Sequence, residues 1–334
     1  MNSSEERKTV LSAENVCQYF PIKDSLGKIK NYVKAVDGVS LCLHQGETYG
    51  LVGETGCGKS TLGRTLIRLL EPTEGKIEIN GRDVSHLKEK ELRPYRKQFQ
   101  MVFQDPYTSL NPRQRVGDIL MDVLKIHHIG TKEERLNTAM KILEIVGLRP
   151  EHFYRYPHEF SGGQRQRVGL ARALILDPQI IVCDEPVSAL DVSIQSQIIN
   201  LLQDLQKKEQ LTYLFIAHDM SVVKYISDRI GIMYLGHIVE EAENEEIFSN
   251  TLHPYAQALL SAVPSTDVHK KKERIVLKGD LPSPLNPPSG CVFHTRCPYA
   301  KEKCNCEVPV CTQMGKGHYV TCHMYQDGRK LENW

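Results

Sequence analysis

The sequence has no long hydrophobic run and almost no excess of charge. No apolar stretch approaches the ~20 residues that cross a bilayer, and the N-terminal stretch MNSSEERKTVLSAENV lacks the apolar segment of a signal peptide. Lys and Arg (42) nearly balance Asp and Glu (41), a formal net charge of +1, so no basic surplus points to nucleic acid. We therefore expect a cytosolic protein without a nucleic-acid partner, which reaches a membrane only through another protein.

The composition is that of a globular protein with an uneven distribution of cysteine. A chain of 334 residues, with 40% apolar and 25% charged residues, can bury a substantial core and is predicted to form more than one domain. Four of the ten cysteines are scattered, and the other six crowd the last part of the chain: Cys291, Cys297, Cys304, Cys306, Cys311 and Cys322. Such clustering suggests a metal site.

The stretch Gly53–Ser60 (GETGCGKS) has the pattern G-x-x-x-x-G-K-S. Its glycines allow the backbone to turn N–H groups inward toward an anion. The preceding residues 48–52 (TYGLV) form a short apolar strand pattern, and residues 61–70 are helix-like. A glycine-rich loop between a strand and a helix predicts a phosphate-binding loop rather than an ordinary turn.

The loop also contains the side chains that bind a nucleotide. Lys59 can reach the β- and γ-phosphates as a point charge, and the Ser60 hydroxyl can bind Mg²⁺. We predict that the loop contributes Gly53, Glu54, Thr55, Gly56, Cys57, Gly58, Lys59, Ser60 and Thr61 to nucleotide binding. Because an ATP-binding protein works in a reducing compartment, free thiols are expected.

Three stretches around this loop read as sheet. Residues 11–20, 34–43 and 73–80 mix or alternate apolar and polar positions. Tyr19 and Phe20 end the first stretch. On local evidence, either ring is as well suited to stacking on an adenine as to packing in the core.

The middle of the chain changes to helical patterns. The strand pattern 99–103 ends at Gln104, and residues 109–156 are amphipathic helix, which predicts a helical insertion. Ser161 is then a candidate N-cap, and Gly162 and Gly163 leave the first amides of the helix open to an anion. A simple helix cap is the alternative explanation.

Two further strand patterns deliver polar side chains to one sheet edge. The apolar run 179–183 ends in Asp184 and Glu185, where α/β sheets bind ligands. Asp184 can hold Mg²⁺ through water, and Glu185 can polarise the water that attacks a γ-phosphate. A surface turn is the alternative. Residues 188–191 (SALD) open another helix, and the strand pattern 212–216 leads to His218.

This ordered series resembles the ATP-binding subunits of ABC transporters over residues 11–240. The correspondences are GETGCGKS with Walker A, Gln104 with the Q-loop, SGGQ with the signature, IIVCDE with Walker B, SALD with the D-loop and His218 with the switch histidine. The resemblance implies an α/β fold: a P-loop ABC-type nucleotide-binding domain with antiparallel β and α-helical subdomains, the latter at about 105–175.

The resemblance also implies an ATPase whose site residues have assigned roles. Its catalytic residues are Glu185, His218 and Gln104. The remaining nucleotide contacts are Phe20, in better register than Tyr19, together with Ser161, Gly162, Gly163, Gln164, Asp184 and Asp191. The Mg²⁺ ligands are Ser60, Gln104 and Asp184. Two subunits pack head to tail in such proteins, so each ATP is enclosed by the signature helix of the other subunit.

Beyond Glu240 the segment EAENEEIFSNTLHPYAQALLSAVP resembles the C-terminal extension of oligopeptide and dipeptide importers, which nickel importers share. We therefore divide the chain into domains at 1–240 and 241–334, with a polar linker run at 269–274 and a small cysteine-rich extension. The tail matches the pattern of that subfamily at Gly290, Cys291, Phe293, Arg296, Cys297, Pro298, Ala300, Cys304, Gly317, His318, Val320, Cys322 and His323.

The matched thiols predict a metal centre. Soft thiolates at wide, uneven spacing suit an iron–sulfur cluster, so we predict a 4Fe-4S cluster held by Cys291, Cys297, Cys304 and Cys322. Cys306 and Cys311 fall outside the pattern. Zinc and metal-free thiols are the alternatives.

The resulting hypothesis is an energy-coupling ATPase subunit of a peptide importer. Its implied partners are a second ABC ATPase subunit, either homologous or a second copy, two transmembrane permease subunits, and an extracellular or periplasmic peptide-binding protein. The alternatives are a soluble ABC ATPase of repair or translation, a nickel importer subunit, and a zinc-binding interaction module. ATPases of repair or translation usually carry long coiled-coil arms or two cassettes in one chain, and this sequence has neither. Many zinc ribbons have paired C-x-x-C motifs, and these are also missing here.

Overall fold

The computed structural model describes residues 8–263 and 274–331. The linker run 269–274 therefore lies, except for Arg274, outside the described residues. The chain divides into two compact units. Of the described residues, unit 1 comprises Lys8, His44–Glu47 and Leu87–Ile216, and unit 2 comprises Thr9–Leu43, Thr48–His86, 217–263 and 274–331. Within the described residues, no helix combines the length and the apolar character needed to span a bilayer.

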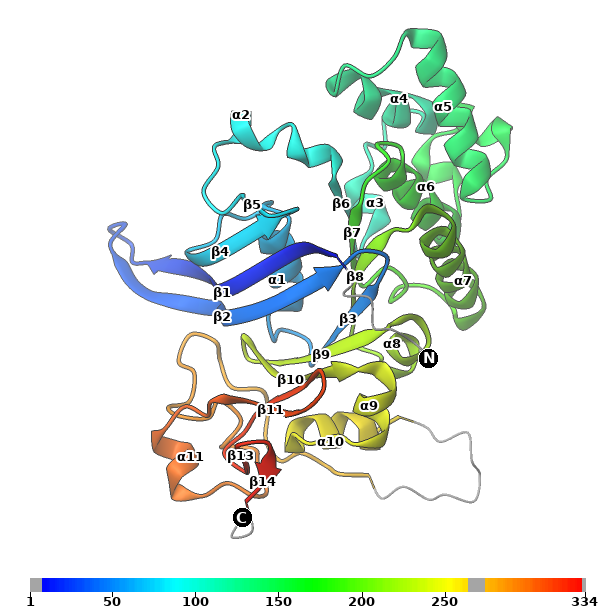
Figure 1. Cartoon of the computed structure of the whole chain (residues 1–334). Coiled ribbons are helices and arrows are strands. Elements are labelled where there is room, and N and C mark those ends of the chain that lie inside the picture. Colours follow the sequence, from blue (N-terminus) through cyan, green and yellow to red (C-terminus); the bar gives the residue numbers. More distant parts are fainter. Residues whose placement is uncertain (1–7, 264–273, 332–334) are drawn as a thin grey trace, which may run out of the picture. The chain divides into compact units, whose positions relative to one another are not determined.

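An antiparallel sheet in unit 2 contains the three strands predicted around the loop. Its order is β2 (Ile29–His44), β1 (Thr9–Lys23), β4 (Glu74–Ile79) and β5 (Arg82–Asp83) (Figure 1). Leu11 pairs with Ile79 and Ala13 with Ile77, and all four side chains are buried. The alternation of the sequence thus places one apolar face on the core.

A second set of strands in unit 2 surrounds the phosphate-binding loop. β3 (Thr48–Val52) runs parallel to β9 (Arg229–Tyr234), which pairs antiparallel with β10 (His237–Glu243). β12 (His318–Thr321) pairs with β10, and β11 (Cys311–Gly315) pairs with β12. The end of the chain therefore extends the sheet to which the β3 strand belongs.

Short helices complete unit 2. Helix α1 (Lys59–Leu66) begins two residues before, and ends four residues before, the predicted helix 61–70. Arg68, at a φ of +57°, prevents continuation of the helix. The other elements are α8 (Met220–Ile226), α9 (Asn244–Ser249), α10 (Pro254–Ser261), α11 (Glu302–Cys306), β13 (Tyr325–Gln326) and β14 (Arg329–Lys330).

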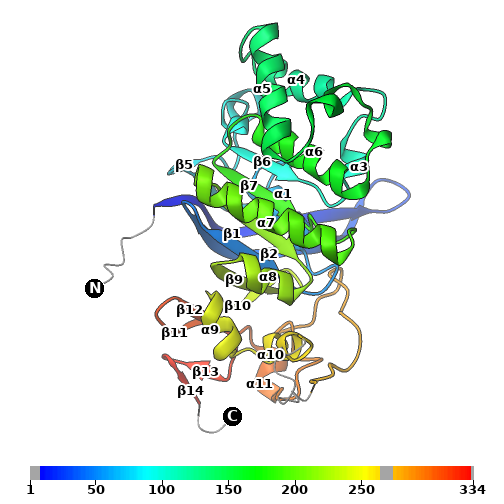
Figure 2. The same cartoon turned by 90° about the vertical axis from the view of Figure 1, so that its right-hand side faces the viewer.

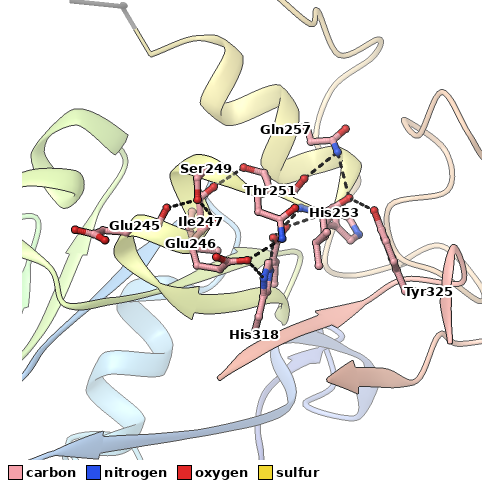
Figure 3. A network of polar contacts seen from close by, with 12 residues as sticks. Glu245, Glu246, Ile247, Ser249, Thr251, His253, Gln257, His318 and Tyr325 are labelled. Carbon is pink, nitrogen blue, oxygen red and sulfur yellow. Dashed lines mark hydrogen bonds and ion pairs between the residues drawn. The ribbon is translucent and has the colours of Figure 1, made fainter. Parts of the chain in front are cut away.

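A buried polar network fastens β12 to its neighbours (Figure 3). His318 Nε2 lies 2.9 Å from Glu240 Oε1, and its Nδ1 lies 3.2 Å from Glu246 Oε1. The Glu240 carboxylate also accepts bonds from the backbone amides of Leu252 and His253. Because Glu240 has no exposed side-chain surface, these donors replace the water that it loses on folding.

Unit 1 contains three parallel strands in the order β8 (Thr212–Ala217), β7 (Ile180–Asp184) and β6 (Phe99–Val102). The continuous apolar run of β7 is wholly buried, as its sequence predicts. The stretch 109–156, predicted as amphipathic helix, contains α4 (Val116–Ile126) and α5 (Lys132–Ile145), which pack with each other and with α6 (Gly162–Leu174) (Figure 2).

The remaining elements of unit 1 are helical. They are α2 (Glu89–Leu92), α3 (Pro106–Ser109), the long α7 (Val192–Glu209), and the 3₁₀ segments η1 (Tyr95–Lys97), η2 (Pro150–Tyr154) and η3 (Pro157–Glu159). The α3 and α6 helices are joined by Arg172, whose guanidinium donates to the Ser109 carbonyl.

Candidate nucleotide-binding site

The phosphate-binding loop connects β3 to α1 within unit 2, as predicted. Gly58 has a φ of +109°, and a Cβ there would lie 2.1 Å from the Ala35 carbonyl oxygen. A Cβ on Gly53 would lie 2.1 Å from the Met233 carbonyl oxygen. Only glycine fits either position, so the neighbouring backbone closely encloses the loop.

Lys59 folds back into its own loop. Its Nζ donates to the carbonyl oxygens of Gly53 at 2.7 Å and Glu54 at 3.0 Å, and only 4% of the residue is exposed. Among the described residues, Lys59 forms no ion pair with an acidic side chain. The loop thus holds a buried ammonium group whose charge is uncompensated, which suits an anionic ligand.

The two aromatic candidates at the end of β1 differ in their surroundings. The Tyr19 hydroxyl donates to Asp37 Oδ1 at 2.5 Å, and the Lys34 ammonium lies 5.3 Å from the centre of its ring. Phe20 is 38% exposed. The ring of Tyr19 is therefore committed to contacts within unit 2, whereas the Phe20 ring has an accessible surface.

In unit 1 the predicted carboxylates lie together with the predicted amide. Asp184 is the last residue of β7 and is fully buried. Glu185 follows at a φ of +45°, and its N–H donates to the Ile216 carbonyl at 3.0 Å. Gln104 Nε2 donates to Glu185 Oε2 at 2.9 Å. The left-handed backbone at a non-glycine residue costs about 1 to 2 kcal/mol, the kind of strain that accumulates at functional sites.

The second predicted helix start is a capping box. Ser161 Oγ accepts from the Gln164 N–H at 3.4 Å, and Gln164 Oε1 accepts from the Ser161 N–H at 3.0 Å. A Cβ on Gly163 would lie 2.4 Å from Ile194 Cγ2, so α6 packs on α7 at this glycine. The capping box explains Ser161 and Gln164, and packing against Ile194 explains Gly163. Contact of these residues with an anion stays a prediction.

The other predicted residues occupy element ends. Asp191 caps α7, with its Oδ1 accepting from the Ile194 N–H at 3.0 Å. His218 directly follows β8 and is exposed. Gln104, Asp184, Glu185, Asp191 and the signature residues belong to unit 1, while the loop, Tyr19, Phe20 and His218 belong to unit 2.

The prediction of an iron–sulfur cluster is wrong. The four predicted ligands Cys291, Cys297, Cys304 and Cys322 line a cavity of only about 10 Å³, roughly the space for one water molecule. Across residues 8–263 and 274–331, no group of three or more His, Cys, Asp or Glu side chains is arranged to hold a metal ion. Burial raises the pKa of Cys297 to about 11 and that of Cys322 to about 12, which disfavours their thiolate forms.

Cys322 acts instead as a small apolar side chain. Cys322 packs in a buried cluster with Leu252, Val320, Met324 and Tyr325. A tail with so little apolar material is not expected to form a core of its own. Here β12 pairs with β10 of unit 2, and the buried cluster of the tail includes Leu252, which precedes α10.

Two residues of the C-terminal region, Tyr255 in α10 and Arg296 in the tail, contact the phosphate-binding loop. The sequence alone does not reveal this role. The Glu54 N–H donates to Tyr255 Oη at 2.8 Å, and the Glu54 carboxylate pairs with Arg296 at 2.8 Å. In the sequence, Arg296 is recognisable only as one residue of the tail pattern. The sequence does not indicate which part of the protein the tail contacts.

The fold and the loop define an ABC-type ATP-binding protein. A family model described as "ABC transporter" matches residues 36–188, and one described as "Oligopeptide/dipeptide transporter, C-terminal region" matches residues 239–304. Among solved structures, the chain resembles the dimeric, post-hydrolysis cassette MJ0796 bound to ADP and Pi. The TM-score is 0.63 at 29% identity, covering 70% of this chain and 98% of that one.

Relatives of known sequence give the family. The chain is 56% identical to the oligopeptide transport ATP-binding protein AppF of Bacillus subtilis (strain 168), over 96% of this chain and 98% of the relative. It is 49% identical to the oligopeptide transport ATP-binding protein OppF of Salmonella typhimurium, over 95% and 97%. This chain belongs to the family of oligopeptide transport ATP-binding proteins.

Proposed function

We propose that this chain is the ATP-hydrolysing, energy-coupling subunit of an ABC importer of peptides. One observation carries the proposal: the phosphate-binding loop and the C-terminal region characteristic of oligopeptide and dipeptide transporters occur in the same chain. The chain is 49 to 56% identical in sequence to relatives named for oligopeptide transport, over nearly their whole length. In this role ATP binding closes a dimer of ATPase subunits, and hydrolysis reopens it.

The residues of the loop bind the triphosphate of ATP. Loop amides other than those of Glu54 and Cys57, which bond within the protein, bind the β- and γ-phosphates. Lys59 exchanges its bonds to Gly53 and Glu54 for bonds to phosphate oxygens. The uncompensated charge of Lys59 and the glycine backbone support this role. Phe20 stacks on the adenine, which its exposed ring permits.

Hydrolysis uses the groups at the end of β7. Glu185 orients and deprotonates the attacking water, and its bond from Gln104 fixes the direction of the carboxylate. His218 assists at the γ-phosphate. The oxygen atoms of Ser60, Gln104 and Asp184 suit Mg²⁺, which prefers oxygen ligands, and the Asp184 carboxylate is fully buried at the end of β7. Bound Mg²⁺ would neutralise phosphate charge.

The working unit is a head-to-tail dimer, with a second copy or a homologous ATPase as the partner. Ser161, Gly162, Gly163 and Gln164 close over the ATP held by the other subunit, next to Asp191. The dimeric state in the name of the similar cassette MJ0796 supports this arrangement. One chain alone therefore completes no site.

The subunit works peripherally at the cytoplasmic face of the cell membrane. Two permease subunits dock near Gln104 and the helical region 105–175, and an extracellular or periplasmic binding protein delivers the peptide. Residues 241–334 form the cysteine-rich C-terminal extension. A nickel importer subunit and a non-transport ATPase remain the alternatives, and the names of the relatives favour peptides over both.

Hydrolysis is tested with the variant Glu185→Gln. It removes the base and keeps the shape, so MgATP turnover should fall about a hundredfold or more while nucleotide affinity is retained. Glu209→Gln, at the exposed end of α7, is the matched control and should hydrolyse at the parental rate. Equal turnover in Glu185→Gln and the parent would remove the catalytic role from Glu185 and shift attention to His218.

Transport is tested with the subunit assembled with its permeases in vesicles. ATP-driven uptake of a labelled oligopeptide, abolished by Glu185→Gln, is the expected result. Uptake of Ni²⁺ without uptake of peptide would favour the nickel importer. An ATPase activity that does not change when permeases or peptide are added would favour the non-transport ATPase.

A further inference from the structure

The C-terminal region is bonded to the phosphate-binding loop at one residue, Glu54. Tyr255, in α10, accepts the Glu54 N–H through its hydroxyl at 2.8 Å and is fully buried. Arg296, between α10 and α11, donates through Nη1 to the Glu54 carboxylate at 2.8 Å. The Arg296 side chain is 8% exposed and that of Glu54 is 27% exposed. Backbone and side chain of one loop residue are thus both held by the tail.

The two tail residues are themselves held in place. The Tyr234 ring packs edge-on against Tyr255 and Phe293, with ring centres 4.7 and 5.1 Å apart. The Arg296 guanidinium lies over Tyr234, 5.9 Å from the centre of its ring. Phe293 is only 1% exposed. Rings packed this closely leave Arg296 little freedom, so its orientation toward Glu54 is built in.

The charge of Glu54 makes this contact important for an anionic ligand. A free carboxylate on the loop would repel phosphates. It would also compete with them for Lys59, whose Nζ already lies 3.0 Å from the Glu54 carbonyl oxygen. Burial alone would lower the pKa of Arg296, but the bond to Glu54 and its charge raise that pKa above the ordinary value. The guanidinium therefore stays charged and neutralises the carboxylate.

We propose that Arg296 and Tyr255 are positioning residues of the nucleotide site, which hold Glu54 of the phosphate-binding loop neutralised and away from Lys59. The C-terminal region then sets the affinity of the loop for phosphates, in addition to any structural role. This inference rests on the proposed binding of ATP by the loop.

The test is titration of the full-length protein with MgATP and MgADP. Arg296→Gln leaves the Glu54 carboxylate unpaired and should weaken binding about tenfold, the size of one charge-assisted contact. Tyr255→Phe keeps the ring and loses one neutral bond, so we expect about a threefold loss. Lys303→Gln is the control, because Lys303 pairs with Glu307 at an exposed site of the same region. It should bind like the parent.

Rescue separates this electrostatic role from a structural one. Glu54→Gln removes the carboxylate and keeps the backbone groups with which Glu54 takes part in the loop, so Arg296→Gln should have no further effect in this background. Glu54→Gln combined with Arg296→Gln should bind MgATP within about twofold of Glu54→Gln alone. A loss in this background as large as that of Arg296→Gln in the parent would mean that Arg296 acts only through folding, and parental affinity in Arg296→Gln would likewise overturn the proposal.

Thermal unfolding without nucleotide accompanies each titration. If Arg296→Gln does not fold, the test relies on Tyr255→Phe. Parental affinity of Tyr255→Phe for MgATP would then refute the proposal. A parent protein that does not bind MgATP would instead refute the proposed function, which keeps the two failures distinct.

Discussion

Lys59 shows how a single residue prepares the loop for its ligand. Its ammonium group is buried against two carbonyl oxygens of its own loop, at 2.7 and 3.0 Å. Carbonyl dipoles stabilise the charge without cancelling it. A phosphate oxygen, which carries a full negative charge, is a stronger partner than a carbonyl oxygen. The exchange of partners therefore favours binding of the triphosphate.

Replacing this residue should abolish tight nucleotide binding. Lys59→Ala removes a charge-assisted contact of about 1.5 to 3 kcal/mol, so MgATP affinity should fall by roughly ten- to a hundredfold. Lys76→Ala, which loses an exposed pair with Glu78, is the control and should leave affinity unchanged. Isothermal titration measures both. Parental affinity in Lys59→Ala would place the phosphates elsewhere.

At the scale of elements, the contact between α6 and α7 depends on one glycine. A Cβ on Gly163 would lie 2.4 Å from Ile194 Cγ2, while a Cβ on Gly169, in the same helix, would meet nothing within 4 Å. The two positions therefore respond oppositely to the same change. The first is fixed by packing, and the second carries only the entropic cost of glycine in a helix.

We expect Gly163→Ala to destabilise the protein by about 1 to 3 kcal/mol, because overpacking forces the two helices apart. Gly169→Ala should stabilise it by up to about 1 kcal/mol. Urea denaturation of both variants gives the free energies of unfolding. If the two changes have the same sign, the close approach of α6 to α7 is not what requires glycine.

The contact of β12 with β10 makes stability depend on pH. Burial lowers the pKa of His318, but its bonds to Glu240 and Glu246 and their charges outweigh burial and raise the pKa above 6.5. The folded state thus holds this proton more tightly than the unfolded chain. The stabilisation is complete below pH 6.5 and is lost as the pH rises through the raised pKa.

The neighbouring His253 acts in the opposite direction. Burial lowers its pKa to about 3. Because the unfolded chain then binds the proton better, His253 disfavours the folded state as the pH falls from 6.5 toward 3. His318, which contacts Glu240 from β10 and Glu246 from α9, and His253, at the start of α10, together contribute most to stability near pH 6.5 (Figure 3).

His318→Gln tests this dependence. It leaves the buried Glu240 without its charged partner, so the free energy of unfolding at pH 6 should fall by about 3 kcal/mol. In this variant, the free energy of unfolding should decline less steeply as the pH rises above 6.5. The control is His323→Gln, because the His323 Nε2 lies 2.9 Å from a neutral group, the Glu307 carbonyl oxygen. An unaltered pH profile in His318→Gln would assign the alkaline loss of stability to other groups.

At the scale of the molecule, a composite site predicts assembly that depends on ATP. We expect Glu185→Gln to bind MgATP without hydrolysing it, so the dimer should accumulate. Size-exclusion chromatography with MgATP, together with the homologous partner if the dimer is heteromeric, should show a stabilised dimer that the parent forms only transiently. Adding Lys59→Ala to this variant should abolish the dimer. A monomer under all conditions would argue against head-to-tail closure.

Local motifs were predictable because adjacent residues determine them. The spacing of glycine, lysine and serine specifies the loop between β3 and α1, and the predicted N-cap Ser161 does cap α6. The stretch 188–191, predicted to open a helix, ends at Asp191, which caps α7. Continuous apolar runs identified β7 and β8 as buried strands. Each inference used only residues within a few positions, where backbone conformation and side-chain hydrogen bonds are decided together.

Only the tertiary structure decided contacts between distant segments. Tyr255 and Arg296 bond to a loop residue 201 and 242 positions earlier, and no local pattern indicates such a partner. The cysteine pattern predicted a cluster, yet the four thiols line a space of about 10 Å³, and Cys322 packs among apolar side chains. The sequence by itself determined the elements and the nucleotide-binding motifs, since these depend on neighbouring residues. Packing decided what the tail does, since its burial and its charge partners exist only once distant strands pair.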